Sequence, residues 1–200
     1  MRQWLNSNDI IFRMNKKTMN TPTIPINQPL RKDRAKDEAW IKAFLQRVPF
    51  GMVATEFEGQ PYIKPTLFVY AEDENALYIH GAVAGHMRTN LEANPRISFC
   101  VAEMGRLLPA DTAMEVGVEY ASVVVFGRAE LVSDRGEARH GLQLLLSRYF
   151  AHLKPGVDYR EIQPEELNIT AVYRVKIDSW SGKADQARED FPGAFYYPSH

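Results

Sequence analysis

A turn of small residues between an apolar strand and a short helix is the part of this chain best suited to bind an anion. Residues 77–80 have an apolar strand pattern, and the helical pattern after the turn ends at Asn94, before Pro95. Backbone N–H groups at the start of a helix are free to donate, and the helix dipole makes that end positive. A phosphorylated ligand is therefore the expected occupant. The residues expected around its phosphate are His80, Gly81, Gly85, His86, Arg88 and Thr89.

The sequence offers little for metal-dependent or hydrolytic chemistry. Its one cysteine, Cys100, lies in an apolar run and is expected to be a buried structural thiol. His140 and His152 fall on a long helical pattern and are expected at the surface. The histidines and the cysteine do not have the spacing of a zinc site, and no Ser–His–Asp order or Gly-x-Ser-x-Gly elbow is present.

Length and composition predict one folded domain with a basic arm. Of the 200 residues, 45% are hydrophobic, which is enough for a full core, and no run is long and apolar enough to cross a bilayer. We expect residues 1–30 to be a flexible N-terminal arm, residues 31–184 the domain, and residues 185–200 a C-terminal tail.

The charges are unevenly distributed along the chain. The first 36 residues hold eight Lys or Arg against two Asp, so the rest of the chain is acidic although the net charge is only −1. An acidic body argues against nucleic acid as a partner, and the lack of a spanning segment argues against a membrane. The lone cysteine and the absence of a secretory signal favour the cytoplasm.

The hydrophobic pattern predicts a mainly β domain with flanking helices. Helices are expected over residues 35–48, 86–94 and 135–153, where apolar residues recur at helical spacing. The links between strands are mostly of hairpin length, which favours an antiparallel barrel over a parallel sheet. About six antiparallel strands are expected, over residues 50–55, 61–70, 76–80, 96–103, 120–132 and 169–178.

Proline and glycine refine these expectations. The strand over 61–70 contains Pro61 and Pro65, so it should be an edge strand or carry a bulge near Pro65. Gly127 is expected to mark a bulge in the strand over 120–132. The segment from Gly105 to Gly117 is expected to be a long connection suited to an interface or a lid.

Six short segments, each weakly informative alone, follow one another in a familiar order. They are Arg31-Lys-Asp-Arg34, Pro49-Phe-Gly-Met-Val-Ala-Thr55, Pro61-Tyr-Ile-Lys-Pro-Thr66, Tyr78-Ile-His-Gly-Ala-Val-Ala-Gly-His86, Ser122-Val-Val-Val-Phe-Gly127 and Ser181-Gly-Lys183. With this order the chain resembles the FMN-binding split β-barrels of the pyridoxamine 5′-phosphate oxidase-like family, in the branch that includes the nitroimidazole-resistance reductases. The resemblance runs from about Arg31 to Ala184. One departure is His86-Met87-Arg88 after Gly85, where such proteins often carry Lys or Arg.

The resemblance implies a homodimer that holds FMN in a cleft between its two barrels. It implies that the isoalloxazine ring lies beside Lys64, Pro65, Thr66 and Leu67, and that His80 and Gly81 lie near the ring and the ribityl chain. His86 and Thr89 would contact the phosphate, with Arg88 as a competing cation. Ser122 and Val123, from either subunit, would also meet the cofactor, and Trp180 and Lys183 would close the cleft.

Most of these residues also have an ordinary structural interpretation. His80 could be a core histidine, His86 a surface residue and Thr89 a helix cap. Lys64 could be a solvated strand residue, Ser122 could bond to the backbone, and Trp180 could belong to the core. The sequence leaves these alternatives open.

The resemblance also implies a redox activity. Electrons or a hydride would pass from a reduced nicotinamide, NADH or NADPH, through the flavin to a small acceptor, and the cofactor would supply the difficult chemistry. Oxidation of pyridoxamine phosphate is less expected, because residues 196–200 offer a second phosphate no cation other than a histidine. Two alternatives remain: a flavin-binding or flavin-sensing module without catalysis, and a haem-binding split barrel with His80 or His86 as axial ligand.

Overall fold

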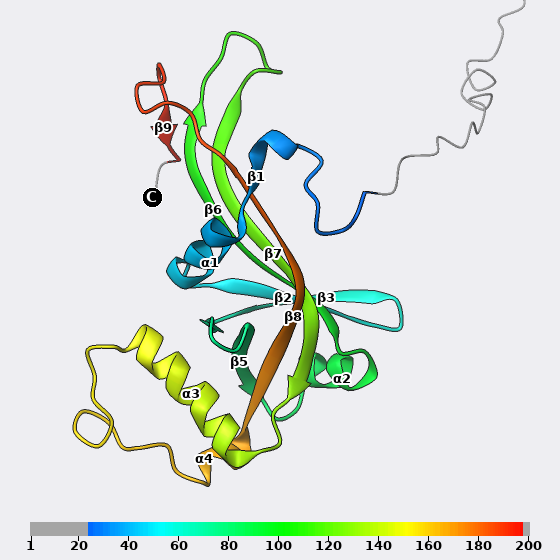
Figure 1. The fold of residues 1–200 in the computed structure, drawn as a ribbon, viewed down its shortest axis with the longest axis vertical. Helices are drawn as coiled ribbons and strands as arrows, with labels where there is room; N and C mark the ends of the chain where they lie inside the picture. The colour runs from blue at the N-terminus through cyan, green and yellow to red at the C-terminus, as the bar shows by residue number, and fades with distance from the viewer. Residues whose placement is uncertain (1–23, 198–200) are drawn as a thin grey trace, which may run out of the picture.

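The computed structural model describes residues 24–197, so most of the predicted N-terminal arm lies outside the described residues. The described chain forms one antiparallel sheet with helices packed around it (Figure 1). After a 3-10 turn (Lys32–Arg34), the elements are β1 (Ala35–Lys36), α1 (Glu38–Arg47), β2 (Gly51–Phe57), β3 (Gln60–Thr66), β4 (Phe68–Ala71), β5 (Ala76–Ala82), α2 (His86–Ala93), β6 (Arg96–Leu108), β7 (Gly117–Leu131), α3 (Arg135–Tyr149), α4 (Glu166–Ile169), β8 (Thr170–Asp185) and β9 (Phe195–Tyr196).

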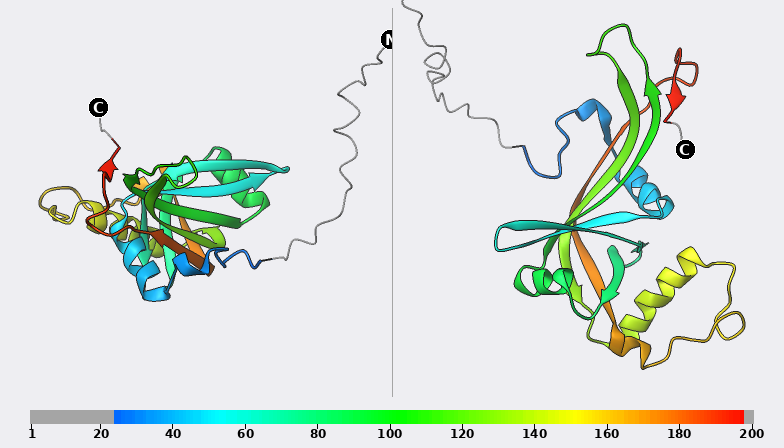
Figure 2. Two further views of the ribbon diagram at one scale, coloured as in Figure 1. Left: turned by 90° about the horizontal axis from the view of Figure 1, so that it is seen from above. Right: turned by 180° about the vertical axis from the view of Figure 1, so that it is seen from behind.

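The sheet closes on itself through a single residue. Its strand order is β3-β2-β6-β7-β8-β5-β4, so β3 and β4 lie at opposite ends of the sheet. Yet only Leu67 separates these two strands along the chain. The two ends must therefore meet at Leu67, which makes the sheet a split barrel; Figure 2 shows the β2–β3 hairpin crossing the long strands.

The expectation of a single strand over residues 61–70 is therefore wrong, because the chain turns at Leu67 and forms one strand on each side of it. Pro65 lies opposite Met52 of β2, and β3 is an edge strand of the described sheet, as its prolines indicated. Because of this split and the two-residue strands β1 and β9, the described sheet has nine strands where six were expected.

Alternating residues of the central strands fill the barrel. Val53, Phe99 and Val125 lie opposite one another on β2, β6 and β7, and each is fully buried. On β8, the alternate residues Ala171, Tyr173, Val175 and Ile177 are buried, but Val172 is buried too, because α3 covers that side. Gly141 of α3 makes this close approach possible, since a Cβ there would lie 2.7 Å from the Tyr78 ring.

Aspartates set the starts of two helices. Asp37 accepts a hydrogen bond from the Trp40 N–H, and Asp134 accepts one from the Glu137 N–H. These caps begin α1 at Glu38 and α3 at Arg135. The helix expected from residue 35 therefore starts too early, because Ala35 and Lys36 pair with β8 instead. The helix expected to reach residue 153 ends at Tyr149.

The connection expected from Gly105 to Gly117 is shorter than expected, because strands occupy both of its ends and only residues 109–116 join them. β6 continues to Leu108 and β7 begins at Gly117, with a bulge between Met104 and Leu107. Gly105 is needed there, because a Cβ would lie 2.8 Å from the Glu119 side chain. The bulge expected at Gly127 is confirmed, and a Cβ at that position would collide with the Lys176 carbonyl.

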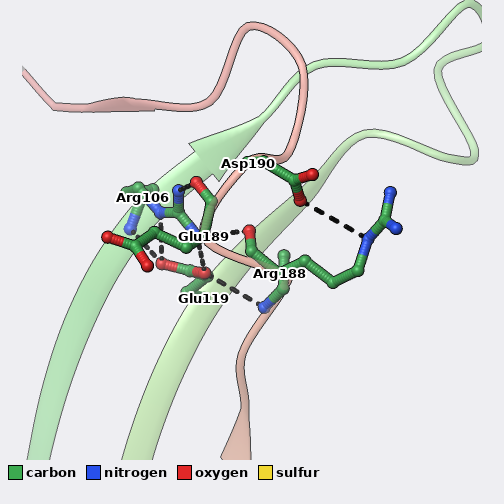
Figure 3. Close-up of polar contacts among 6 residues, drawn as sticks. Arg106, Glu119, Arg188, Glu189 and Asp190 are labelled. Atoms are coloured by element: carbon green, nitrogen blue, oxygen red, sulfur yellow. Dashed lines mark hydrogen bonds and ion pairs between the residues drawn. The ribbon is translucent and has the colours of Figure 1, made fainter.

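The chain after β8 is strapped across this long β6–β7 hairpin (Figure 3). Arg106 pairs with the buried Glu119 at 2.7 Å and donates hydrogen bonds to the carbonyl oxygens of Arg188 and Glu189. Glu119 also accepts a hydrogen bond from the Ala187 N–H. The chain then forms β9, which pairs with β6. We call residues 186–197 the C-terminal strap.

Candidate functional site

The start of α2 presents the polar side chains that the sequence predicts at an anion. Gly85 precedes the helix with φ 122°, a conformation that favours glycine. His86 and Thr89 are exposed, and the His86 ring lies 5.5 Å from the Tyr62 ring. Thr89 makes no side-chain cap bond in this helix, so the capping alternative is not supported. Arg88 is held by Glu92, one turn further along.

A buried polar pair holds α2 against the barrel, and the sequence did not reveal it. The Asn90 amide donates a hydrogen bond to the Thr55 hydroxyl over 2.9 Å, and both residues are buried. Asn94, at the end of the helix, also bonds to Glu56. The only available signal was an asparagine in the middle of a short helix, which is unfavourable unless its amide finds a partner.

Lys64, His80 and Gly81 meet where β3 comes close to β5. The Lys64 ammonium donates a hydrogen bond to the His80 carbonyl over 3.3 Å. A Cβ placed on Gly81 would lie 3.3 Å from this ammonium and 3.2 Å from the Met87 methyl, so the glycine makes room for these two side chains. Burial lowers the pKa of Lys64, which favours its losing a proton more readily than a solvated lysine would.

The His80 imidazole is half-buried, and its Nδ1 atom is enclosed without a hydrogen-bond partner among residues 24–197. Burial, and then the charge of Lys64, lowers the pKa of His80. The ring is therefore neutral near pH 7 and can accept a hydrogen bond at one nitrogen. A buried polar atom without a partner is the kind of group that a bound ligand satisfies.

The residues around the turn at Leu67 differ in accessibility. Pro65 is exposed, and Leu67 is 36% exposed. Thr66 is buried, and its hydroxyl donates to the Leu67 carbonyl over 3.0 Å. A ligand beside this segment would therefore contact Pro65, Leu67 and the backbone, and would not reach the Thr66 side chain.

The other predicted site residues lie on two faces of the sheet. Val123 is fully buried, and Trp180 packs edge-on against Tyr70 with ring centroids 6.1 Å apart. Val123 therefore belongs to the core and offers a ligand only its backbone, whereas Trp180 is partly buried against the core, so both interpretations of Trp180 stay open. Ser122 alternates with the buried valines and so points outward, and Lys183 lies opposite it on β8.

Next to Ser122 and Lys183 the structure adds a residue that the sequence did not single out. Tyr120 lies two residues from Ser122 on β7, and the Lys183 ammonium is 5.0 Å from the centre of its ring. Arg34 donates to the Tyr120 hydroxyl over 3.4 Å. Tyr120 also lines a cavity of about 330 Å³ with Trp40 and Asp185.

The described residues hold no metal-ligand cluster, and their cysteine is a poor nucleophile. Within residues 24–197 there is no His, Cys, Asp or Glu group that could hold a metal ion. Cys100 is half-buried, and burial raises the pKa of its thiol, which disfavours a nucleophilic thiolate. Across the same residues, no helix has the length and apolarity of a membrane span.

Comparison with known proteins agrees with this fold. A family model described as pyridoxamine 5′-phosphate oxidase matches residues 37–184. The flavocytochrome Anf3 from Azotobacter vinelandii is similar in structure, with 25% sequence identity, a TM-score of 0.69, and coverage of 86% of this chain and 85% of that one.

Two further solved structures share the fold at lower identity. The FAD and haem binding protein from Mycobacterium smegmatis has 23% identity and a TM-score of 0.66, covering 77% of this chain and 74% of that one. A Bacteroides thetaiotaomicron protein described as a candidate 5-nitroimidazole antibiotic resistance protein has 22% identity and a TM-score of 0.60, covering 76% and 89%. No curated protein sequence matches the chain.

Proposed function

Because the chain belongs to the pyridoxamine 5′-phosphate oxidase family, we propose that it is a flavoprotein that binds FMN and passes electrons from NADH or NADPH to a small acceptor. The proposal rests on one observation: the exposed N-terminus of α2 lies next to Lys64, His80 and Gly81, on one side of a barrel of this family. Such a group supplies cations, free backbone donors and a close backbone approach, which a flavin phosphate and ring both need.

The residues present fit the parts of FMN. His86 and Thr89 are exposed at the helix start, where a phosphate is favoured by the dipole and by free N–H groups. The Lys64 ammonium lies against Gly81, and the enclosed Nδ1 of His80 offers a polar contact beside them. When bound, the flavin supplies the two-electron chemistry, and the protein binds, orients and shields it.

The two faces of the sheet support a homodimer. Lys64 lies opposite Val53 on the inward row of the barrel, whereas Ser122 and Lys183 lie on the outward face. If all three contact one flavin, they cannot all belong to one chain. A second copy, laying its outward β7–β8 face against the Lys64 side of the first, would complete the site.

The outward face of the sheet has the apolar composition of a surface that another protein chain covers. Met52, Cys100, Val124 and Ser181 lie opposite one another across four strands, without a charge among them. Met52 is 43% exposed, and Met104 on the same side of β6 is 58% exposed. A contiguous apolar sheet face that water reaches in the single chain favours protein association.

The absorption spectrum of the protein, purified without added cofactor, tests the cofactor. Flavin gives bands in the blue, and mass spectrometry of the released chromophore distinguishes FMN from FAD. A colourless protein that also fails to bind added FMN and FAD would overturn the proposal.

Light scattering after size exclusion tests the dimer. The wild-type protein should elute as a dimer at micromolar concentration, and Val124→Glu should shift it toward monomer by placing a charge in the apolar face. Val157→Glu is the matched control, because Val157 is 79% exposed in a loop outside that face. A wild-type monomer at these concentrations would contradict the assembly.

Haem binding is a second candidate, favoured by the similarity to a flavocytochrome. The neutral His80 imidazole has a free nitrogen, which is the form that ligates iron. A Soret band in the purified protein, lost in His80→Ala and kept in His86→Ala, would establish this alternative.

A further inference from the structure

Tyr120 stands out among the residues that the proposed function has not used. It lies on the outward face of β7, two residues from Ser122 and so about 7 Å along the strand. Lys183, predicted at the cofactor, lies opposite Ser122 on β8, and Asp185 lies opposite Tyr120. A small molecule bound beside Ser122 and Lys183 would therefore have the Tyr120 phenol within reach.

Two cations flank the Tyr120 phenol. The Arg34 guanidinium donates to the hydroxyl over 3.4 Å, and the Lys183 ammonium lies 5.0 Å from the ring centre. Both positive charges favour the phenolate over the neutral phenol. Partial burial opposes this effect, but the hydrogen bonds and charges of Lys183 and Arg34 outweigh it and lower the pKa of Tyr120.

The surrounding charges are fixed by the fold. β1 pairs with β8, which brings Arg34 beside Asp185, and the two form an ion pair at 2.6 Å. Arg31, the next cation toward Tyr120, is paired with Asp33. The two-residue strand β1 thus has a clear consequence, because it holds Arg34 at the phenol. Tyr120 is also one of the residues that line the 330 Å³ cavity, which gives a small acceptor room nearby.

Resting on the proposed function, we propose that Tyr120 is the proton donor to the acceptor, and that the acceptor is a quinone-like molecule whose oxygen becomes an anion on reduction. Arg34 and Lys183 would stabilise both that oxyanion and the phenolate left by proton transfer. The quinone receives a hydride from the reduced flavin and a proton from the Tyr120 hydroxyl. It leaves as the hydroquinone, and the phenolate regains its proton from water.

The first test uses the phenol itself and needs no activity. Ultraviolet difference titration of wild-type protein against Tyr120→Phe should show one tyrosine that ionises below the ordinary pKa of about 10. Arg34→Gln keeps a donor but removes the charge, and should move this ionisation upward. Tyr197→Phe is the control, because Tyr197 is exposed. An ordinary pKa for Tyr120 would overturn the proposal.

The second test follows oxidation of the NADPH-reduced, FMN-loaded protein by menadione, a quinone, in single turnover. Tyr120→Phe should slow this step about 100-fold, within the range of general acid catalysis, while reduction by NADPH and the affinity for FMN stay as in wild type. Normal FMN binding with an unchanged oxidation rate would overturn the role of Tyr120 alone. Failure of the wild-type protein to bind flavin would overturn the proposed function, and this inference with it.

Discussion

The Lys64 ammonium donates a hydrogen bond to the His80 carbonyl over 3.3 Å, although β3 and β5 are not neighbours in the strand order of the sheet. This contact spans the place where the two ends of the sheet approach each other at Leu67. Closure of the barrel therefore brings together a cation from one sheet end and a strand from the other, and the candidate site lies at that closure.

Replacing Lys64 with Met should weaken FMN and riboflavin binding alike, by about 10-fold, because the ammonium lies beside Gly81 on the ring side of the proposed site. Burial lowers the pKa of Lys64, so in the wild type this loss should also develop with rising pH, starting below the ordinary lysine pKa of about 10.4. Fluorescence quenching titrations across pH measure both effects. A pH dependence that persists in the variant would assign it to another group.

Replacing His86 and Thr89 together with Ala should weaken FMN binding by about 10- to 100-fold. Both side chains are exposed at the start of α2, where charge-assisted hydrogen bonds to a phosphate are worth about 1.5–3 kcal/mol each. Riboflavin lacks the phosphate and should be much less affected. Equal losses for the two ligands would show that the segment shapes the barrel and does not hold the phosphate.

Thr55→Val should destabilise the protein by about 1–3 kcal/mol, because it leaves the buried Asn90 amide without its partner. Thr55→Ser keeps the hydroxyl and should retain that hydrogen bond at the smaller cost of one methyl group. Urea unfolding measures the difference between the two variants. If Thr55→Val is as stable as the wild type, the hydrogen bond does not hold α2 to the barrel.

Glu119→Gln should release the C-terminal strap while the barrel stays folded. Hydrogen bonds from Arg106 are the main cause that lowers the pKa of Glu119 to about 2, from an ordinary 4.5. The stabilisation that this carboxylate gives is thus fully present above pH 4.5 and is lost as the pH falls toward 2. Hydrogen exchange at Phe195 and Tyr196 should show this loss in the wild type, and fast exchange at all pH values in the variant. If the amides of β5 exchange as fast as those of β9 in the variant, the strap supports the whole fold.

Much of the fold was predictable because it depends on local patterns. The alternation on β8, the bulge at Gly127 and the edge position of Pro65 all follow from residue types a few positions apart. The split at Leu67 was not predictable in this way. Residues 61–70 have strand character throughout, and only the closure of the barrel requires the chain to change partners between Thr66 and Phe68.

The extended β6–β7 hairpin shows the same limit. Glycines at 105 and 117 indicated a loop. Position 105 needs a glycine because the Glu119 side chain packs against it. The Glu119 side chain in turn points inward because Arg106 and the C-terminal strap form hydrogen bonds with it. These partners are 13 and more residues apart, so no local pattern could reveal them.

The sequence by itself determined the family and the β-rich barrel, and it predicted an anion site at the α2 N-terminus, since each rests on short segments of the chain. Only the tertiary structure decided which predicted site residues can meet. It placed Lys64 beside His80, buried Val123 in the core, and turned Ser122 and Lys183 to the opposite face with Tyr120. The reason is physical: the face on which a strand residue points depends on the register and closure of the whole sheet, and a shift of one residue reverses it.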